Sequence, residues 1–154
     1  MSEIEKNLEK LGITLPDAPA PTANYVPWVK TGNLVFISGQ VTMGPNGLEY
    51  QGKVGKDFTI EEAQGAARLC AINLLAQLKA ACNGDLEHVR RCVKLGGFVN
   101  ATPEFENHPQ VINGASDLLV EVLGERGRHA RFAVGAGGLP FNVAVEIDAV
   151  FEVD

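Results

Sequence analysis

The fold is decided by residues 130–151, which read ARFAVGAGGLPFNVAVEIDAVF. Residues 130–135 form a short apolar run that contains one arginine, and residues 142–150 alternate between apolar and polar or small side chains. Alternation with a period of two is typical of a strand with two unlike faces. The segment therefore predicts two strands, joined by the Gly-Gly-Leu-Pro sequence at residues 137–140.

Arg131 and Glu146 are the charged residues of chemical interest in this segment. If the two strands pair through the turn, both side chains lie on the less apolar face of the sheet. An arginine and a carboxylate above small residues are typical of a site for a small molecule. The alternative is a surface salt bridge, which contributes only about 0–1 kcal/mol to stability.

Composition indicates an ordinary globular protein. The chain has 154 residues, of which 45% are hydrophobic and 21% charged, and this length predicts a single domain. We place an N-terminal helix and an extended lead-in at residues 1–24 and the domain at 25–154. The net charge of -6 disfavours a dedicated nucleic-acid binder.

The cysteines and the N-terminus indicate a cellular compartment. Cys70, Cys82 and Cys92 lie in apolar segments without C-x-x-C spacing, which predicts buried, reduced thiols. We find no apolar signal region and no stretch long enough to span a membrane. These features predict a soluble cytoplasmic protein without a membrane partner.

The chain predicts a regular order of elements. Capping boxes at Ser2 and Thr59 begin two helices, over residues 2–11 and 60–82. Further elements are expected as strands at 25–30, 34–41, 49–53 and 89–100, the last broken at Gly96-Gly97, and as a helix near 111–123.

Each of the two longer helices joins two strands, so each predicts a crossover on one face of a single sheet. We therefore expect an α+β fold with one mixed sheet of about six strands and two main helices on one face. The opposite face would carry Phe36, Val93 or Phe98. An apolar face without a cover favours oligomerisation, with closed rotational symmetry as the default.

Several motifs in order resemble the signature of the Rid (YjgF/YER057c/UK114) family. In that family a strand of the form A-R-x-x-V precedes a Leu-Pro turn and a V/I-E-I/V-E/D-A strand. In this chain the C-terminal motif matches residues 130–134, 139–140 and 145–149. Upstream segments that also match are Tyr25-Val26, residues 32–40, residues 52–55, Val93-Lys94 and residues 111–113.

The resemblance implies a chorismate-mutase-like fold, assembled as a homotrimer with sites in the clefts between subunits. It also implies a cofactor-free and metal-free enamine/imine deaminase that converts 2-aminoacrylate-type acids to 2-keto acids and ammonia, a form of metabolite repair. Arg131 would bind the substrate carboxylate. Glu146 would orient or deprotonate the attacking water. The alternative for Glu146 is a solvated strand residue.

Further family positions near the cleft are Tyr25, Ser38, Lys94, Asn113 and Pro140. Read from the sequence alone, Tyr25 is equally compatible with half-buried packing and Ser38 with a satisfied buried hydroxyl. Lys94 and Asn113 are equally compatible with exposed surface positions.

The chain departs from the family pattern beside the arginine. Ala133 stands where many deaminating members have cysteine, so we expect no thiol chemistry. Phe132 replaces a residue that is commonly small, although the strand pattern directs it away from Arg131.

Two other functions stay open. One is a non-catalytic module that binds a small carboxylate through Arg131. The other is the endoribonuclease activity of some relatives, which the acidic charge and the absence of a histidine pair disfavour. His88, His108 and His129 lack ligand spacing, and we expect them at the surface. A chorismate-mutase role would rest on fold analogy alone.

Overall fold

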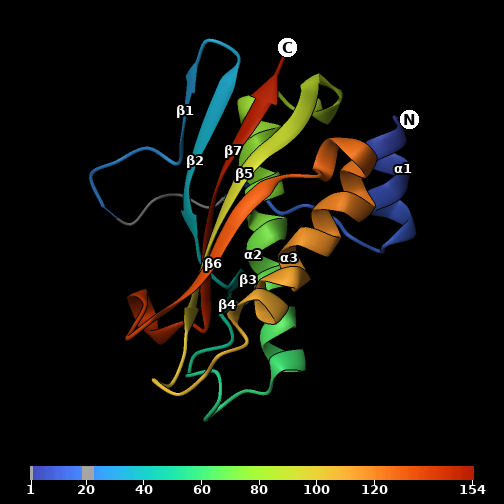
Figure 1. Cartoon of the computed structure of the whole chain (residues 1–154). Helices are drawn as coiled ribbons and strands as arrows, with labels where there is room; N and C mark the ends of the chain where they lie inside the picture. Colours follow the sequence, from blue (N-terminus) through green and yellow to red (C-terminus); the bar gives the residue numbers. More distant parts are fainter. Residues whose placement is uncertain (1, 19–22) are drawn as a thin grey trace.

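A five-stranded sheet with helices on one face forms the centre of the molecule (Figure 1). The structure is a computed structural model that describes residues 2–18 and 23–154. The helices are α1 (Glu3–Lys10), α2 (Ile60–Ala81) and α3 (His108–Leu123). The sheet contains β1 (Trp28–Thr31), β2 (Leu34–Gln40), β5 (Val89–Asn100), β6 (Ala130–Ala136) and β7 (Val145–Val153), in the order β1-β2-β7-β5-β6.

The predicted capping boxes begin two of the helices. The Ser2 side chain accepts a hydrogen bond from the Glu5 amide at the start of α1, and Thr59 does the same with Glu62 at the start of α2. Each cap satisfies amide groups that a helix end leaves without partners. The predicted bounds of both helices are thus confirmed to within two residues.

The pairing predicted for the two C-terminal strands is wrong. Strand β6 pairs in parallel with β5, and β7 pairs antiparallel with β5 on its other side. Helix α3 joins β5 to β6 and supplies the crossover connection that two parallel neighbouring strands require. The 137–140 segment therefore passes across the end of β5 instead of forming a hairpin, and β6 becomes an edge strand.

Three smaller expectations also need correction. The sheet has five main strands, where about six were expected. Strands β3 (Met43–Gly44) and β4 (Gly47–Leu48) form a separate hairpin, and no strand forms at 49–53, where one was expected.

The first strand begins at Trp28 and not at Tyr25. Pro27 has no amide hydrogen to donate, and the Ser38 amide and hydroxyl donate to the carbonyls of Pro27 and Val26, respectively.

Strand β5 continues through Gly96 and Gly97. A side chain at Gly97 would collide with Ile112 of α3, and one at Gly96 with Asp148 and Phe132. These glycines therefore permit close packing on the two faces of the strand and do not break it.

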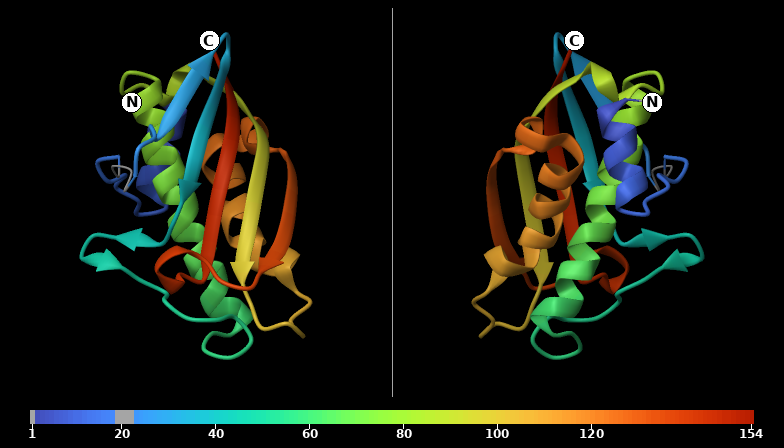
Figure 2. Two further views of the ribbon diagram at one scale, coloured as in Figure 1. Left: turned by 90° about the vertical axis from the view of Figure 1, so that its left-hand side faces the viewer. Right: turned by 90° about the vertical axis from the view of Figure 1, so that its right-hand side faces the viewer.

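The two faces of the sheet differ in cover. Helices α2 and α3 pack on one face, where the core includes Val35, Leu95, Ile147 and Phe151. Figure 2 shows the opposite face without helices over it. Phe36 and Phe98 lie there with 45% and 37% of their surface exposed. None of the described helices is long and apolar enough to cross a membrane.

Candidate active site

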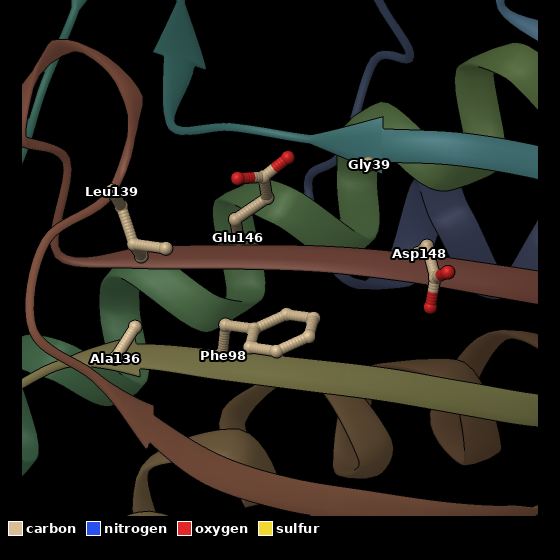
Figure 3. Close-up of a pocket in the computed structure, with 6 residues that line it drawn as sticks. All are labelled: Gly39, Phe98, Ala136, Leu139, Glu146 and Asp148. Atoms are coloured by element: carbon tan, nitrogen blue, oxygen red, sulfur yellow. The ribbon is translucent and has the colours of Figure 1, made fainter.

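The uncovered face of the sheet holds an open hollow of about 380 Å³ that contains two carboxyl groups (Figure 3). We call it the Glu146 hollow, and it is lined by Gly39, Phe98, Ala136, Leu139, Glu146 and Asp148. The two acids project from β7, Phe98 from β5, and Leu139 from the segment between β6 and β7. Strand register places Glu146 beside Phe98 and Asp148 beside Gly96.

A bulge in β2 makes room for the Glu146 carboxylate. The register between β2 and β7 shifts between Ile37 and Gln40, which leaves Ser38 and Gly39 at the irregularity. A Cβ atom at Gly39 would overlap Glu146 Oε2. Bulges re-aim side chains and are common beside functional sites. Here glycine is needed because the acid occupies the space that a side chain at this position would fill.

The environment of the hollow changes the acidity of both carboxyl groups. Partial burial raises the pKa of Glu146, and the neighbouring charge of Asp148 raises it further. Burial also raises the pKa of Asp148, while the Lys94 ammonium and a hydrogen bond from the Gly96 backbone act in the opposite direction. Desolvation disfavours the charged form of an acid and like charges disfavour it again. Glu146 therefore holds a proton more readily than an ordinary glutamate does, which suits it to proton exchange.

Arg131 lies on the other face of the sheet, so the prediction that it shares a face with Glu146 is wrong. Its guanidinium donates to Ser116 Oγ at 3.0 Å and to the Pro109 carbonyl at 3.2 Å, both on α3. The error follows from the register, because Arg131 pairs with Leu95 on the helix-covered face, whereas Glu146 pairs with Phe98 on the uncovered face.

The predicted alternative, an Arg131 ion pair with Glu146, is also not formed. Within residues 2–18 and 23–154, no ion pair includes Arg131. Both of its recorded acceptors are neutral, so its positive charge is not compensated by a side chain that the structure describes. An arginine held in this way can bind a carboxylate through its remaining donors.

The other predicted site residues are divided between these regions. Asn113 lies four residues after Pro109 and three before Ser116, which places it on the stripe of α3 that faces Arg131. Lys94 extends over the Phe132 ring at 5.7 Å on the uncovered face. Phe132 thus points away from Arg131, as its strand position predicts.

Tyr25, Ser38 and Pro140 are not among the residues that line the Glu146 hollow. Tyr25 is 49% exposed and precedes β1. Ser38 Oγ donates to the Val26 carbonyl at 2.8 Å, so its hydroxyl fixes the segment that carries Tyr25. Pro140 is exposed and begins the short helical turn Pro140–Asn142.

Two residues of the hydrogen-bond network around Arg131, Ser116 and His129, are not among the predicted site residues. Ser116 Oγ contacts His129 Nε2 at 2.9 Å, and His129 Nδ1 contacts the Gly127 carbonyl at 2.6 Å. His129 is half-buried, so it is less exposed than the surface position expected for it. The sequence holds a weak signal for this contact, because residues 109, 113 and 116 share one stripe of a helix.

A second network that the sequence does not indicate holds the loop beside the hollow. Lys53 Nζ donates to Asn100 Oδ1 and to the Gly137 carbonyl, each at 2.8 Å. The buried Asn100 amide donates in turn to Asn142 Oδ1 at 3.2 Å and to the Val143 carbonyl at 3.1 Å. These bonds fix both ends of the segment that supplies Leu139 to the hollow.

The cysteines agree with the expectation that they are buried and free. All three are unpaired thiols inside the molecule. Burial raises the pKa of each thiol, which lowers its reactivity at neutral pH.

Comparison with known proteins agrees with the fold and with these motifs. Residues 5–152 match the family described as "YjgF/chorismate mutase-like, putative endoribonuclease", and the chain belongs to this family. It is 47% identical over 152 residues to the protein TCP17 of Trypanosoma cruzi, covering 98% of this chain and 94% of the relative.

The name of one relative states a deaminase activity. The chain is 27% identical over 142 residues to a 2-iminobutanoate/2-iminopropanoate deaminase of Dermatophagoides farinae, covering 92% of this chain and 95% of the mite protein. Among solved structures, the protein Atu1372 of unknown function from Agrobacterium tumefaciens is 55% identical. It superposes with a TM-score of 0.93 over 99% of this chain and 93% of its own.

Proposed function

We propose that the protein hydrolyses 2-imino acids, together with their enamine tautomers, to 2-keto acids and ammonia. The observation that supports this most strongly is the half-buried Glu146, whose pKa is raised on the floor of an open hollow. An acid in that state can take a proton from water and return it to a leaving amine. The similarity to the Dermatophagoides farinae deaminase supports the same class of reaction.

The reaction needs no group beyond those of the chain and water. The substrate reacts as the protonated imine. Glu146 accepts a proton from water as the water oxygen adds to the imine carbon, which gives a neutral carbinolamine. The carboxyl group returns that proton to the amine nitrogen. The C–N bond then breaks, the hydroxyl proton passes to the Glu146 carboxylate as the carbonyl forms, and ammonia leaves and takes up that proton as ammonium. Arg131 binds the substrate carboxylate throughout, and its charge strengthens the electron-withdrawing effect of that group.

Arg131 and Glu146 of one chain lie on opposite faces of the sheet, so one copy alone does not present both groups to a small acid. We propose that the site lies between two copies in a homotrimer. The β6 edge of one copy would then bring its Arg131 to the hollow of the next. The uncovered aromatic side chains around the hollow, including Phe98, give such an assembly an apolar surface to bury.

Direct measurement of imine hydrolysis tests the reaction. An amino-acid oxidase generates 2-iminopropanoate in the cuvette, and keto-acid formation is followed with and without the protein. We expect acceleration by the wild type and loss of about 100-fold or more in kcat/KM for Arg131→Ala. Arg68→Ala, which removes an exposed arginine from α2, is the matched control and should keep full activity.

Mixing two inactive variants tests the shared site. Arg131→Ala and Glu146→Gln chains are unfolded together, refolded together and assayed. If each site combines residues of two copies, the mixture forms some sites with both native groups and regains activity. A mixture as inactive as its components would contradict the shared site. No acceleration by a folded wild-type oligomer with any imine would contradict the deaminase itself and favour a carboxylate-binding module.

A further inference from the structure

The side chains behind Arg131 form a chain of hydrogen bonds whose donors and acceptors can be assigned from their chemistry. The Gly127 carbonyl only accepts, so His129 Nδ1, 2.6 Å away, is the donor. In the neutral ring the other nitrogen, Nε2, is then an acceptor. Ser116 Oγ, at 2.9 Å, therefore donates its proton to His129 and keeps its lone pairs for Arg131 Nη1.

From this geometry we propose that Ser116 and His129 are positioning residues for Arg131. They act on the substrate only through the guanidinium, and the inference rests on the proposed role of Arg131 as the carboxylate-binding group. His129 fixes the direction of the Ser116 hydroxyl, and Ser116 fixes Nη1. The Pro109 carbonyl fixes Nη2.

The charge of the partners explains why this arrangement suits a binding residue. A carboxylate at position 116 or 129 would hold the guanidinium more tightly but would neutralise its charge. A hydroxyl and a carbonyl leave the charge available to an anion. Arginine also loses considerable side-chain entropy when it is ordered. Ordering before binding leaves less of that cost to the binding step.

The network does not extend to the proton-transfer group. Ser116 lies on α3, and His129 lies in the segment that enters β6, whereas Glu146 projects from the uncovered face of β7. Loss of Ser116 should therefore weaken substrate binding and leave the chemical step intact. If Ser116 had only a structural role, its loss would lower the stability of the protein and would change both KM and kcat.

The first experiment measures Arg131 itself, without any activity. The Nε signal of Arg131 in a ¹⁵N NMR spectrum, assigned by its absence in Arg131→Lys, reports guanidinium rotation and proton exchange. We expect exchange at least several-fold faster in Ser116→Ala than in the wild type, and wild-type behaviour in Ser116→Thr, which keeps a hydroxyl. Ser2→Ala removes the N-cap of α1, which contacts neither Arg131 nor its two acceptors, and should leave the signal unchanged.

The second experiment separates binding from chemistry. For Ser116→Ala we expect KM for 2-iminopropanoate to rise 5- to 20-fold with kcat within twofold, and the Kd of pyruvate, measured by calorimetry, to rise in parallel. His129→Phe should give a smaller rise in the same direction, and Ser116→Thr should restore the wild-type values.

The outcomes distinguish the two proposals. Unchanged Arg131 exchange in Ser116→Ala, or unchanged KM in an active enzyme, would overturn the positioning role. If the wild type hydrolyses no imine, the deaminase proposal is wrong. If Arg131 Nε exchange is nevertheless faster in Ser116→Ala, the positioning role of Ser116 is retained.

Discussion

The Arg131 region, formed by Arg131 with Ser116 and Pro109, and the Glu146 hollow lie on opposite faces of one sheet. The first leaves a charge without a counter-ion among the residues that the structure describes, and the second disfavours a charge. Arg131 is held by a hydroxyl and a carbonyl, neither of which compensates its charge. Glu146 lies against Phe98 and near Asp148, where burial and like charge disfavour its ionised form. In the proposed function, the first region binds the anionic substrate and the second exchanges a proton, so substrate binding and proton transfer would be separated within one chain.

Glu146→Gln should give the largest loss of activity and should act on the hollow alone. We expect kcat for imine hydrolysis to fall about 100-fold or more, because amide side chains do not transfer protons in this way, with KM changed little. A fall in kcat of less than fivefold would show that another group transfers the proton.

The same variant should be more stable than the wild type at neutral pH. Because the pKa of Glu146 is raised on folding, its protonated form favours the folded state, and that contribution is lost as pH rises through the raised pKa. We expect Tm at pH 7.5 to rise by about 1–3 °C in Glu146→Gln. The difference should disappear below the ordinary glutamate pKa of 4.5, measured by thermal denaturation across pH.

Gly39→Ala should disturb the same acid through the backbone of β2. The added methyl group would occupy the position of the carboxylate, so Glu146 must move. We expect a loss of kcat of about 10-fold or more. Gly138→Ala is the control, because a Cβ there meets nothing within 4 Å. Equal activities of the two alanine variants would show that the position of Glu146 is not critical.

Lys53→Met should loosen the loop that supplies Leu139 and leave the Arg131 region unaffected. The substitution removes the hydrogen bonds to Asn100 and to the Gly137 carbonyl but keeps the length of the side chain. We expect KM to rise about threefold and Tm to fall by about 2–4 °C, corresponding to roughly 1 kcal/mol. A changed Arg131 Nε signal in this variant would contradict the independence of the two regions.

Asp148→Asn should give the smallest change in rate and an informative change in its pH dependence. The variant removes a negative charge that raises the pKa of Glu146, so that pKa should fall. Glu146 accepts a proton only when ionised, and the rate therefore decreases as pH falls through its pKa. We expect this acidic limb of the kcat profile to move to lower pH, with the plateau rate changed about twofold or less. A shift to higher pH would contradict the assignment of the limb to Glu146.

Local patterns in the sequence determined most elements of the fold. The capping boxes at Ser2 and Thr59 located two helices, and the alternation after Asn142 located β7, because caps and periodicity act over a few residues. Family motifs indicated Arg131 and Glu146, whose roles stay predictions until they are measured. The sequence alone did not indicate Ser116 or His129, because hydroxyl and imidazole groups are common in both structural and functional contacts.

Tertiary structure decided which of these residues meet. The order and register of strands depend on which elements pack together over long separations. The register of β6 and β7 against β5 puts Arg131 on the face of Leu95 and Glu146 on the face of Phe98. A period of two shows that a strand has two faces, but it does not show which neighbour lies beside it. Only the folded chain placed Ser116 and His129 behind Arg131, and Gly39 beneath the Glu146 carboxylate.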